Sequence, residues 1–131
     1  MALLELFKDD PNYFEVKSGK ALYREDDPAD VMYVLVEGMA DLSKDGFLFE
    51  ELSPGKIVGE MSVIDGSPHF GTVTAKTDCK FVLVDKKHFN FLVDETPGFA
   101  VEVMRVLVQR LKNCDLRFLQ AISTKSSSIS T

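Results

Sequence analysis

The stretch that decides the fold prediction, residues 57–75, reads IVGEMSVIDGSPHFGTVTA. A short apolar run ends at the Gly-Glu pair 59–60, a one-turn helix is expected over 61–64, and Asp-Gly-Ser-Pro at 65–68 is typical of a turn. Residues 71–75 alternate in the manner of a strand. Glycine lets the backbone approach a ligand closely, and a helix start offers free N–H groups to an anion. The stretch therefore predicts a small anion pocket between two strands.

On both sides of this stretch, short apolar segments alternate with turn residues. Further strands are expected at residues 13–16, 21–23, 31–36, 39–42, 47–52 and 79–84. The Asp45-Gly46 pair favours a tight hairpin between the fourth and fifth of these, because glycine readily adopts a positive φ. Short strands at intervals of roughly 8 to 12 residues, separated by Gly and Pro, are typical of a sandwich or barrel.

The pattern changes from strands to helices after Asp85. A helix is expected over 86–95, and a longer one from about Pro97 to Ile122. The Ser/Thr-rich residues 123–131 are predicted to form a disordered tail. We therefore expect one domain over residues 1–122, with strands at about 13–85 and helices at about 86–122.

The long helix has an apolar face and a charged face. Its apolar positions step by three and four, the spacing of a heptad stripe: Met104, Leu107, Leu111, Cys114, Phe118 and Ala121. Two interpretations stay open: the stripe packs on the strands, or it forms a seam for a homodimer or another protein partner. The charged positions are expected on the solvated face: Arg105, Arg110, Lys112 and Arg117.

Composition excludes several classes of partner. The chain has 131 residues and a formal net charge of −6, which argues against a nucleic-acid interface because phosphate contacts demand clustered Lys and Arg. No apolar run approaches the roughly 20 residues of a membrane span. The first ten residues lack the basic region of a signal peptide. These features predict a cytoplasmic protein without a membrane partner, in which Cys79 and Cys114 are free thiols.

An enzyme is one class of function to weigh, and a barrel of short strands suggests a metal-dependent cupin. Such a site needs several His and carboxylate ligands that converge inside the barrel. The chain has two histidines, His69 and His88, and they fall in different predicted elements. No nucleophile motif or phosphate-binding P-loop is present. The sequence therefore predicts no catalysis, no metal and no cofactor.

Residues 57–75 resemble the phosphate-binding cassette of the cyclic nucleotide-binding domain, the family of bacterial catabolite activators and regulatory subunits of cAMP-dependent kinase. That cassette reads approximately G-E-x-[AS]-L, a turn, and P-R-[AST]-A. The matching positions are Gly59, Glu60, Met61, Ser62, Val63 and Pro68. The next three positions differ, since His69 replaces the family's arginine, Phe70 a small residue and Gly71 an alanine. The resemblance thus implies the fold together with a degenerate cassette.

Further matches extend the resemblance to about residues 13–115. They lie at residues 14–19, 30–38 (DVMYVLVEG), 55–60 and 97–111. The resemblance implies a mainly β domain with flanking helices. Its strands would form an eight-stranded antiparallel jelly-roll barrel with a short cassette helix, followed by C-terminal helices.

The resemblance also implies a ligand site for cAMP or cGMP. In the family, the cassette glutamate accepts a hydrogen bond from the ribose 2′-hydroxyl, the arginine pairs with the cyclic phosphate, and the long helix closes over the base. Glu60 is then the ribose candidate, and His69 would face the phosphate. The backbone of Gly59, Met61 and Ser62 would supply further contacts. A second interpretation makes Glu60 simply a carboxylate that stabilises a helix N-terminus.

The missing arginine weakens the predicted phosphate contact. Arginine offers a permanent positive fork, whereas a histidine with a pKa near 6.5 is only about a quarter charged at pH 7. A hydrogen bond to a charged group is worth about 1.5–3 kcal/mol, which corresponds to about ten- to a hundred-fold in affinity. The Phe70 ring would crowd the phosphate or turn into the core, and Gly71 would relieve crowding.

The sequence therefore predicts a regulatory domain with weak or no binding of cyclic nucleotides. The alternative is a genuine cAMP or cGMP sensor that uses Glu60, backbone donors and His69. In that case, nucleotide binding should strengthen as the pH is lowered from about 8 to about 6, because the protonated imidazolium is the form that pairs with the phosphate. A domain that binds a protein partner instead of a nucleotide is a third possibility.

Overall fold

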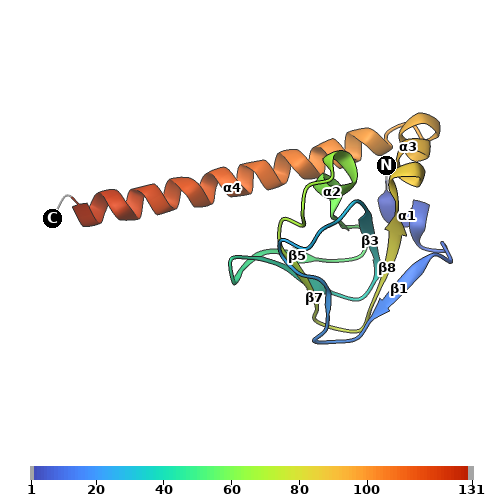
Figure 1. Ribbon diagram of the computed structural model, residues 1–131, viewed down its shortest axis with the longest axis horizontal. Helices are drawn as coiled ribbons and strands as arrows, with labels where there is room; N and C mark the ends of the chain where they lie inside the picture. Colours follow the sequence, from blue (N-terminus) through green and yellow to red (C-terminus); the bar gives the residue numbers. More distant parts are fainter. Residues whose placement is uncertain (1, 130–131) are drawn as a thin grey trace.

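Two four-stranded antiparallel sheets form the body of the molecule, and helices cover one side of it (Figure 1). The computed structural model describes residues 2–129, with side chains described through residue 114. The first sheet has the order β1 (Tyr13–Val16), β8 (Cys79–Val84), β3 (Met32–Glu37) and β6 (Ile57–Val58). The second has the order β2 (Ala21–Tyr23), β7 (Thr72–Ala75), β4 (Ala40–Lys44) and β5 (Phe47–Leu52).

The helices are α1 (Leu3–Phe7), α2 (Glu60–Asp65), α3 (Lys86–Glu95) and α4 (Phe99–Ile129). The mainly β class with flanking helices is confirmed, as are eight antiparallel strands. A closed barrel is not formed, because the strands divide into two separate sheets. Along the chain, every connection between consecutive strands passes from one sheet to the other, except the β4–β5 hairpin. The connection between β5 and β6 is the Ser53–Lys56 turn, in which Lys56 N donates to Ser53 O.

Strands β3 and β8 are buried on both faces. Leu35 and Phe81 belong to the apolar cluster between the two sheets, while Val34 and Val82 belong to a second cluster under the helices. This double burial explains why both strands read as nearly continuous apolar runs instead of alternating. The second cluster includes Phe7 of α1, Val63 of α2, Leu92 of α3, and Phe99 and Val103 of α4.

Helix α3 matches its predicted bounds, and the Asp85 carboxylate caps it by accepting a hydrogen bond from His88 N at 2.8 Å. Helix α4 begins at Phe99, two residues after Pro97, because Gly98 adopts a φ of 90° before the helix starts. It ends at Ile129 and so includes residues 123–129, where the sequence predicted disorder. Ser and Thr are only moderately poor helix formers, and continuing a helix avoids the cost of nucleation. Residues 130–131 lie outside the described part, and the predicted domain boundary stays a prediction.

The apolar residues of α4 divide between two faces, unlike the single stripe that was predicted. Leu107 and Cys114 pack against the body, whereas Met104 and Leu111 are 54% and 62% exposed. Phe118 and Ala121 lie beyond the described side chains. The inner face of the helix carries Phe99, Val103, Leu107, Arg110 and Cys114, and the outer face carries Val101, Met104, Val108 and Leu111.

Candidate functional site

Gly59 turns the chain from β6 into α2 and sets the position of the site. Its φ is 81°, and a Cβ at this position would lie 2.9 Å from Val31 O of the neighbouring segment. Only glycine tolerates both conditions without strain. Glu60 therefore begins α2 next to strand β3, and its side chain is buried, with 2% exposure.

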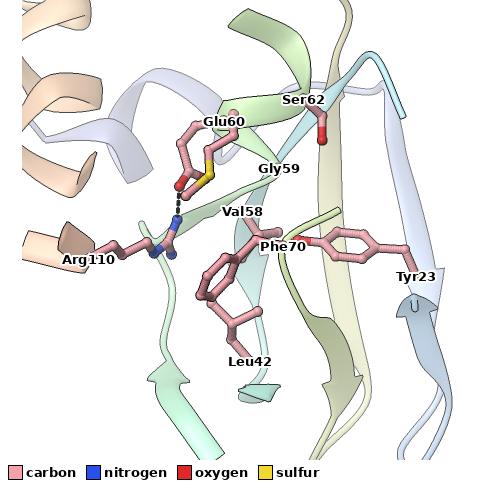
Figure 2. A pocket seen from close by; sticks show the side chains of 9 residues that line it. Tyr23, Leu42, Val58, Gly59, Glu60, Ser62, Phe70 and Arg110 are labelled. Carbon is pink, nitrogen blue, oxygen red and sulfur yellow. Dashed lines mark ion pairs between the residues drawn. The ribbon is translucent and has the colours of Figure 1, made fainter. Parts of the chain in front are cut away.

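The Glu60 carboxylate forms an ion pair with Arg110, which reaches into the site from α4 (Figure 2). The distance from Arg110 Nη1 to Glu60 Oε1 is 2.6 Å, and Arg110 is 3% exposed. Arg110 Nη2 donates to Ile57 O at 2.6 Å. Nε and Nη2 also donate to the two carboxylate oxygens of Glu50, both at 3.3 Å. Burial lowers the pKa of Arg110, but the charges of Glu60 and Glu50 outweigh it and leave this pKa raised.

His69 is buried beside the pocket and does not line it. Its ring stacks on Tyr23 with centroids 3.4 Å apart and an interplanar angle of 6°. Its backbone pairs with the acidic turn, since His69 N donates to Asp27 O and Asp26 N donates to His69 O. Ser62 Oγ lies 3.5 Å from Nδ1. Burial lowers the pKa of His69, so the ring is mostly neutral at pH 7, and its predicted phosphate contact stays a prediction.

Phe70 and Gly71 are explained by packing against the second sheet. Phe70 lines the pocket and meets Phe49 edge-to-face at 5.1 Å between ring centroids, with Lys44 Nζ 4.9 Å from the centre of its ring. At Gly71, a Cβ would lie 2.4 Å from Ser43 O of β4. The glycine thus allows the backbone of β4 to approach. The sequence predicted that Gly71 would relieve crowding by the Phe70 ring.

Little space is left in the pocket that these elements enclose. Its lining consists of Tyr23, Leu42, Val58, Gly59, Glu60, Met61, Ser62, Phe70 and Arg110. Figure 2 shows the Arg110 side chain extending to Glu60 across the pocket from Tyr23. The free volume is about 10 Å³, which is about the space for one water molecule. A nucleotide would therefore enter only if side chains that line the pocket moved.

Five of the predicted site residues come together around this pocket, and the other two lie beside it; the ligand contacts predicted for all seven stay predictions. Gly59, Glu60, Met61, Ser62 and Phe70 line it, whereas His69 packs behind it and Gly71 contacts β4. The expectation that Arg110 is solvated was wrong. A signal was present in the spacing, because Arg110 lies seven residues after Val103 and four before Cys114, on the same face of the helix. A positively charged side chain on the apolar face of a helix indicates a buried partner of opposite charge.

The described residues form neither a cluster of metal ligands nor a helix that could span a membrane. Among residues 2–129, no three His, Cys, Asp or Glu side chains gather where they could hold a metal ion. No helix in that part of the chain is long and apolar enough to cross a membrane.

The sequence pattern of the family described as "Cyclic nucleotide-binding domain" matches residues 13–96, which are more than half of the chain. The chain belongs to the cyclic nucleotide-binding domain family. The matched region contains both sheets, α2 and α3, and so every residue that lines the pocket except Arg110.

Curated relatives of this cyclic nucleotide-binding domain include much longer proteins. The lysophospholipase nte1 of Neurospora crassa is 28% identical over 105 residues, which cover 76% of this chain and 7% of that protein. The lysophospholipase NTE1 of Coccidioides immitis is 28% identical over 120 residues, with 88% and 8% covered. The chain thus spans less than a tenth of the length of these relatives.

Solved structures agree on the fold. A protein of a cyclic-GMP-dependent signalling pathway that regulates bacterial phytopathogenesis has a TM-score of 0.70 and 25% identity, over 86% of this chain and 95% of that one. The catabolite activator protein of Thermus thermophilus has a TM-score of 0.73 and 23% identity, with 85% and 54% covered. The second likeness concerns the fold alone.

Proposed function

We propose that this cyclic nucleotide-binding domain is a non-enzymatic regulatory domain that binds cAMP and cGMP weakly or not at all. One observation carries the proposal: the Glu60 carboxylate, which the family resemblance assigns to the ribose, is already paired with Arg110 at 2.6 Å. A nucleotide would have to break this pair in a site with about 10 Å³ of free volume. Breaking a buried ion pair is costly, typically by about 3–5 kcal/mol.

The charge of the site also opposes a cyclic phosphate. One guanidinium, that of Arg110, stands between the carboxylates of Glu50 and Glu60, so the three groups together carry a charge of −1. A phosphodiester brings a further negative charge into a poorly solvated place. The family's arginine is replaced by His69, which is buried and mostly neutral at pH 7.

Calorimetric titration with cAMP and with cGMP, at about pH 6 and about pH 8, tests the proposal. We expect dissociation constants weaker than about 100 µM, or no saturable heat, at both pH values. Saturable binding in the micromolar range would overturn the proposal in favour of a nucleotide sensor. Binding that strengthens at the lower pH would then assign the phosphate to His69, and binding that is flat with pH would remove His69 from the site.

We further propose that α4 is the partner-binding element of the domain and pairs with a second copy of the chain. Its outer face carries Val101, Met104, Val108 and Leu111, exposed by 47%, 54%, 50% and 62%. Their spacing of three, four and three residues is that of a coiled-coil seam. Light scattering after gel filtration tests this: we expect a dimer, and a monomer when Met104 and Leu111 are both replaced by Glu. A wild-type monomer would overturn the pairing with a second copy and would leave a different protein as the partner of α4.

We also propose that this regulatory domain is cytoplasmic. Its thiols, Cys79 and Cys114, are free, which suits a reducing compartment. The sequence-derived net charge of −6 fits a protein that stays in solution and away from anionic surfaces.

A further inference from the structure

Two cavities adjoin on the flank of α4, where this helix faces α1 and the turn between β5 and β6. The first has a volume of about 350 Å³ and is lined mainly by apolar residues, among them Leu3, Leu4, Pro54 and Val106. The second has a volume of about 260 Å³ and is lined mainly by polar residues. Lys56 and Val106 line both, so the cavities form one groove with an apolar end and a polar end, which we call the flank groove. Its size is that of a small-molecule site.

The walls of the flank groove are held in place by buried contacts. The turn that forms one wall is tied to β3, because Gly55 N donates to Leu35 O at 2.8 Å and Leu35 N donates to Lys56 O at 2.9 Å. Leu3 of α1 is 7% exposed, and Val106 of α4 packs against the same apolar cluster under the helices. A site that is ordered before binding loses less conformational entropy when a ligand arrives.

The polar end of the flank groove presents two cations that are available to a ligand. Lys56 is exposed, and none of the ion pairs among residues 2–114 involves its ammonium group. Arg105 is 72% exposed and pairs across one turn with Glu102 at 3.2 Å. Such a pair is weak, so the guanidinium remains accessible to another anion. Arg110 also lines this end, but its own carboxylate partners already occupy it.

Charge distinguishes the flank groove from the cavities beside β1. Each of those two cavities is lined by two lysines and three carboxylates, a formal charge of −1. The polar end of the flank groove has three cations and one carboxylate, a formal charge of +2, in a chain whose net charge is −6. With Glu102 at the apolar end, the whole groove keeps a charge of +1. An anion is therefore attracted to the flank groove and repelled from the cavities beside β1.

We propose that the flank groove binds a small amphiphilic anion, which has a carboxylate or phosphate head and an unbranched apolar chain. The head lies at Lys56 and Arg105, where the guanidinium fork pairs with two oxygens and the ammonium adds a second positive charge. The chain lies along Leu4, Pro54 and Val106, where its methylene groups leave water.

The inference goes beyond the proposed function and does not depend on it. The flank groove shares only Arg110 with the cassette pocket. The domain can therefore respond to an amphiphilic anion whether or not its cassette holds a nucleotide.

Titration of the isotope-labelled full chain with octyl phosphate, followed through backbone amide chemical shifts, tests the proposal. We expect saturable binding with a dissociation constant of about 100 µM or tighter, and the largest shifts at residues 2–4, 54–57 and 102–110. Octanoate carries a similar chain on a carboxylate, so the ratio of the two affinities shows which head the groove prefers. Inorganic phosphate and octyltrimethylammonium should each bind at least about ten-fold more weakly, because the first lacks the chain and the second has the opposite charge.

Four variants assign the contacts. Lys56→Gln and Arg105→Gln should each weaken the binding of octyl phosphate about ten-fold, because each removes one charge-assisted contact with the head. Leu4→Ser should weaken it about three-fold and leave the binding of inorganic phosphate unchanged, because it removes part of the apolar wall. Lys112→Gln is the matched control, since it removes the same charge from an exposed position of α4 outside the groove, and it should leave the affinity unchanged.

Absence of saturation by both octyl phosphate and octanoate at millimolar concentration would overturn the inference. Equal affinity for octyltrimethylammonium would also overturn it, because the groove would then not select an anion, and so would shifts confined to the outer face of α4. An equal loss of affinity in Lys112→Gln would reduce the binding to attraction by net charge and overturn the site. The two proposals fail separately, since micromolar binding of cAMP would remove the proposed function and leave the titration with octyl phosphate unchanged.

Discussion

Positions 69 and 110 exchange the roles that their surroundings in the sequence suggest: the sequence suggests a cation of the pocket at position 69 and a solvated charge at position 110. Position 69 belongs to the cassette, where the family has its cation, yet it holds a buried histidine stacked on Tyr23. Position 110 belongs to a helix with several solvated charges, yet its arginine is 3% exposed and pairs with Glu60. In this chain the positive charge at the pocket comes from α4, and the cassette position holds a buried aromatic ring. Burial and partners therefore decide the role of each side chain here, and its surroundings in the sequence do not.

The largest expected effect comes from removing the cation at position 110. Arg110→Leu should lower the free energy of unfolding by about 3–5 kcal/mol, because it leaves Glu60 buried without a partner. The double variant with Glu60→Leu should recover part of that loss. Urea unfolding of both single variants and the double variant measures the coupling energy.

The pair Glu102–Arg105, with side chains 20% and 72% exposed, is the control for this cycle, and its coupling should be below about 0.5 kcal/mol. Equal coupling energies for the two pairs would mean that burial does not strengthen the Arg110–Glu60 pair relative to the Arg105–Glu102 pair.

Restoring the family's arginine at position 69 should give a smaller, but still destabilising, effect. His69→Arg with Phe70→Ala places a cation where the side chain is 4% exposed and stacked, so we expect a loss of about 2–4 kcal/mol. We expect no gain in cAMP binding while Arg110 occupies Glu60. Calorimetry and urea unfolding of this variant check both statements, and a gain of ten-fold or more in affinity would show that the cation at position 69 alone limits binding.

The smallest expected effect is on the pH dependence of the free energy of unfolding. Burial holds the pKa of His69 below its ordinary value, so the unfolded chain binds a proton at a pH where the folded chain does not. The free energy of unfolding should therefore be highest above about pH 6.5 and fall below it, by at most about 1.4 kcal/mol per pH unit from this group. His69→Phe should remove this part of the slope, whereas His88→Gln should keep it. Identical slopes in all three proteins would contradict the assignment to His69.

Much of the fold was predictable because its signals are local. The bounds of β1, β2, β5, β8 and α3 follow from short apolar runs and from turn residues and caps next to them. The strand pattern allowed a sandwich or a barrel, but which strands share a sheet was not predictable, because it depends on how distant strands pair. The heptad stripe on α4 was misplaced for a similar reason, since both faces of the helix carry apolar residues and only packing decides which one is buried.

The candidate site was predictable where it depends on the cassette and not where it depends on α4. Gly59 and Glu60 could be assigned from their motif, and both line the pocket. Arg110 lies 50 residues further along the chain, and nothing local to it names Glu60 as its partner. His69 could be recognised as a departure from the family, but its stacking on Tyr23 depends on the pairing of the loop with the acidic turn.

The length of α4 gives the Arg110 contact a mechanical meaning. At about 1.5 Å per residue, about 16 Å of helix separate Phe99 from Arg110, and about 28 Å lie between Arg110 and Ile129. The helix is therefore a lever with its fulcrum at the cassette and its longer arm outside the body. A tilt about this point that moves Phe99 by one ångström moves Ile129 by nearly two, so the helix converts small shifts at its buried start into larger displacements at its far end.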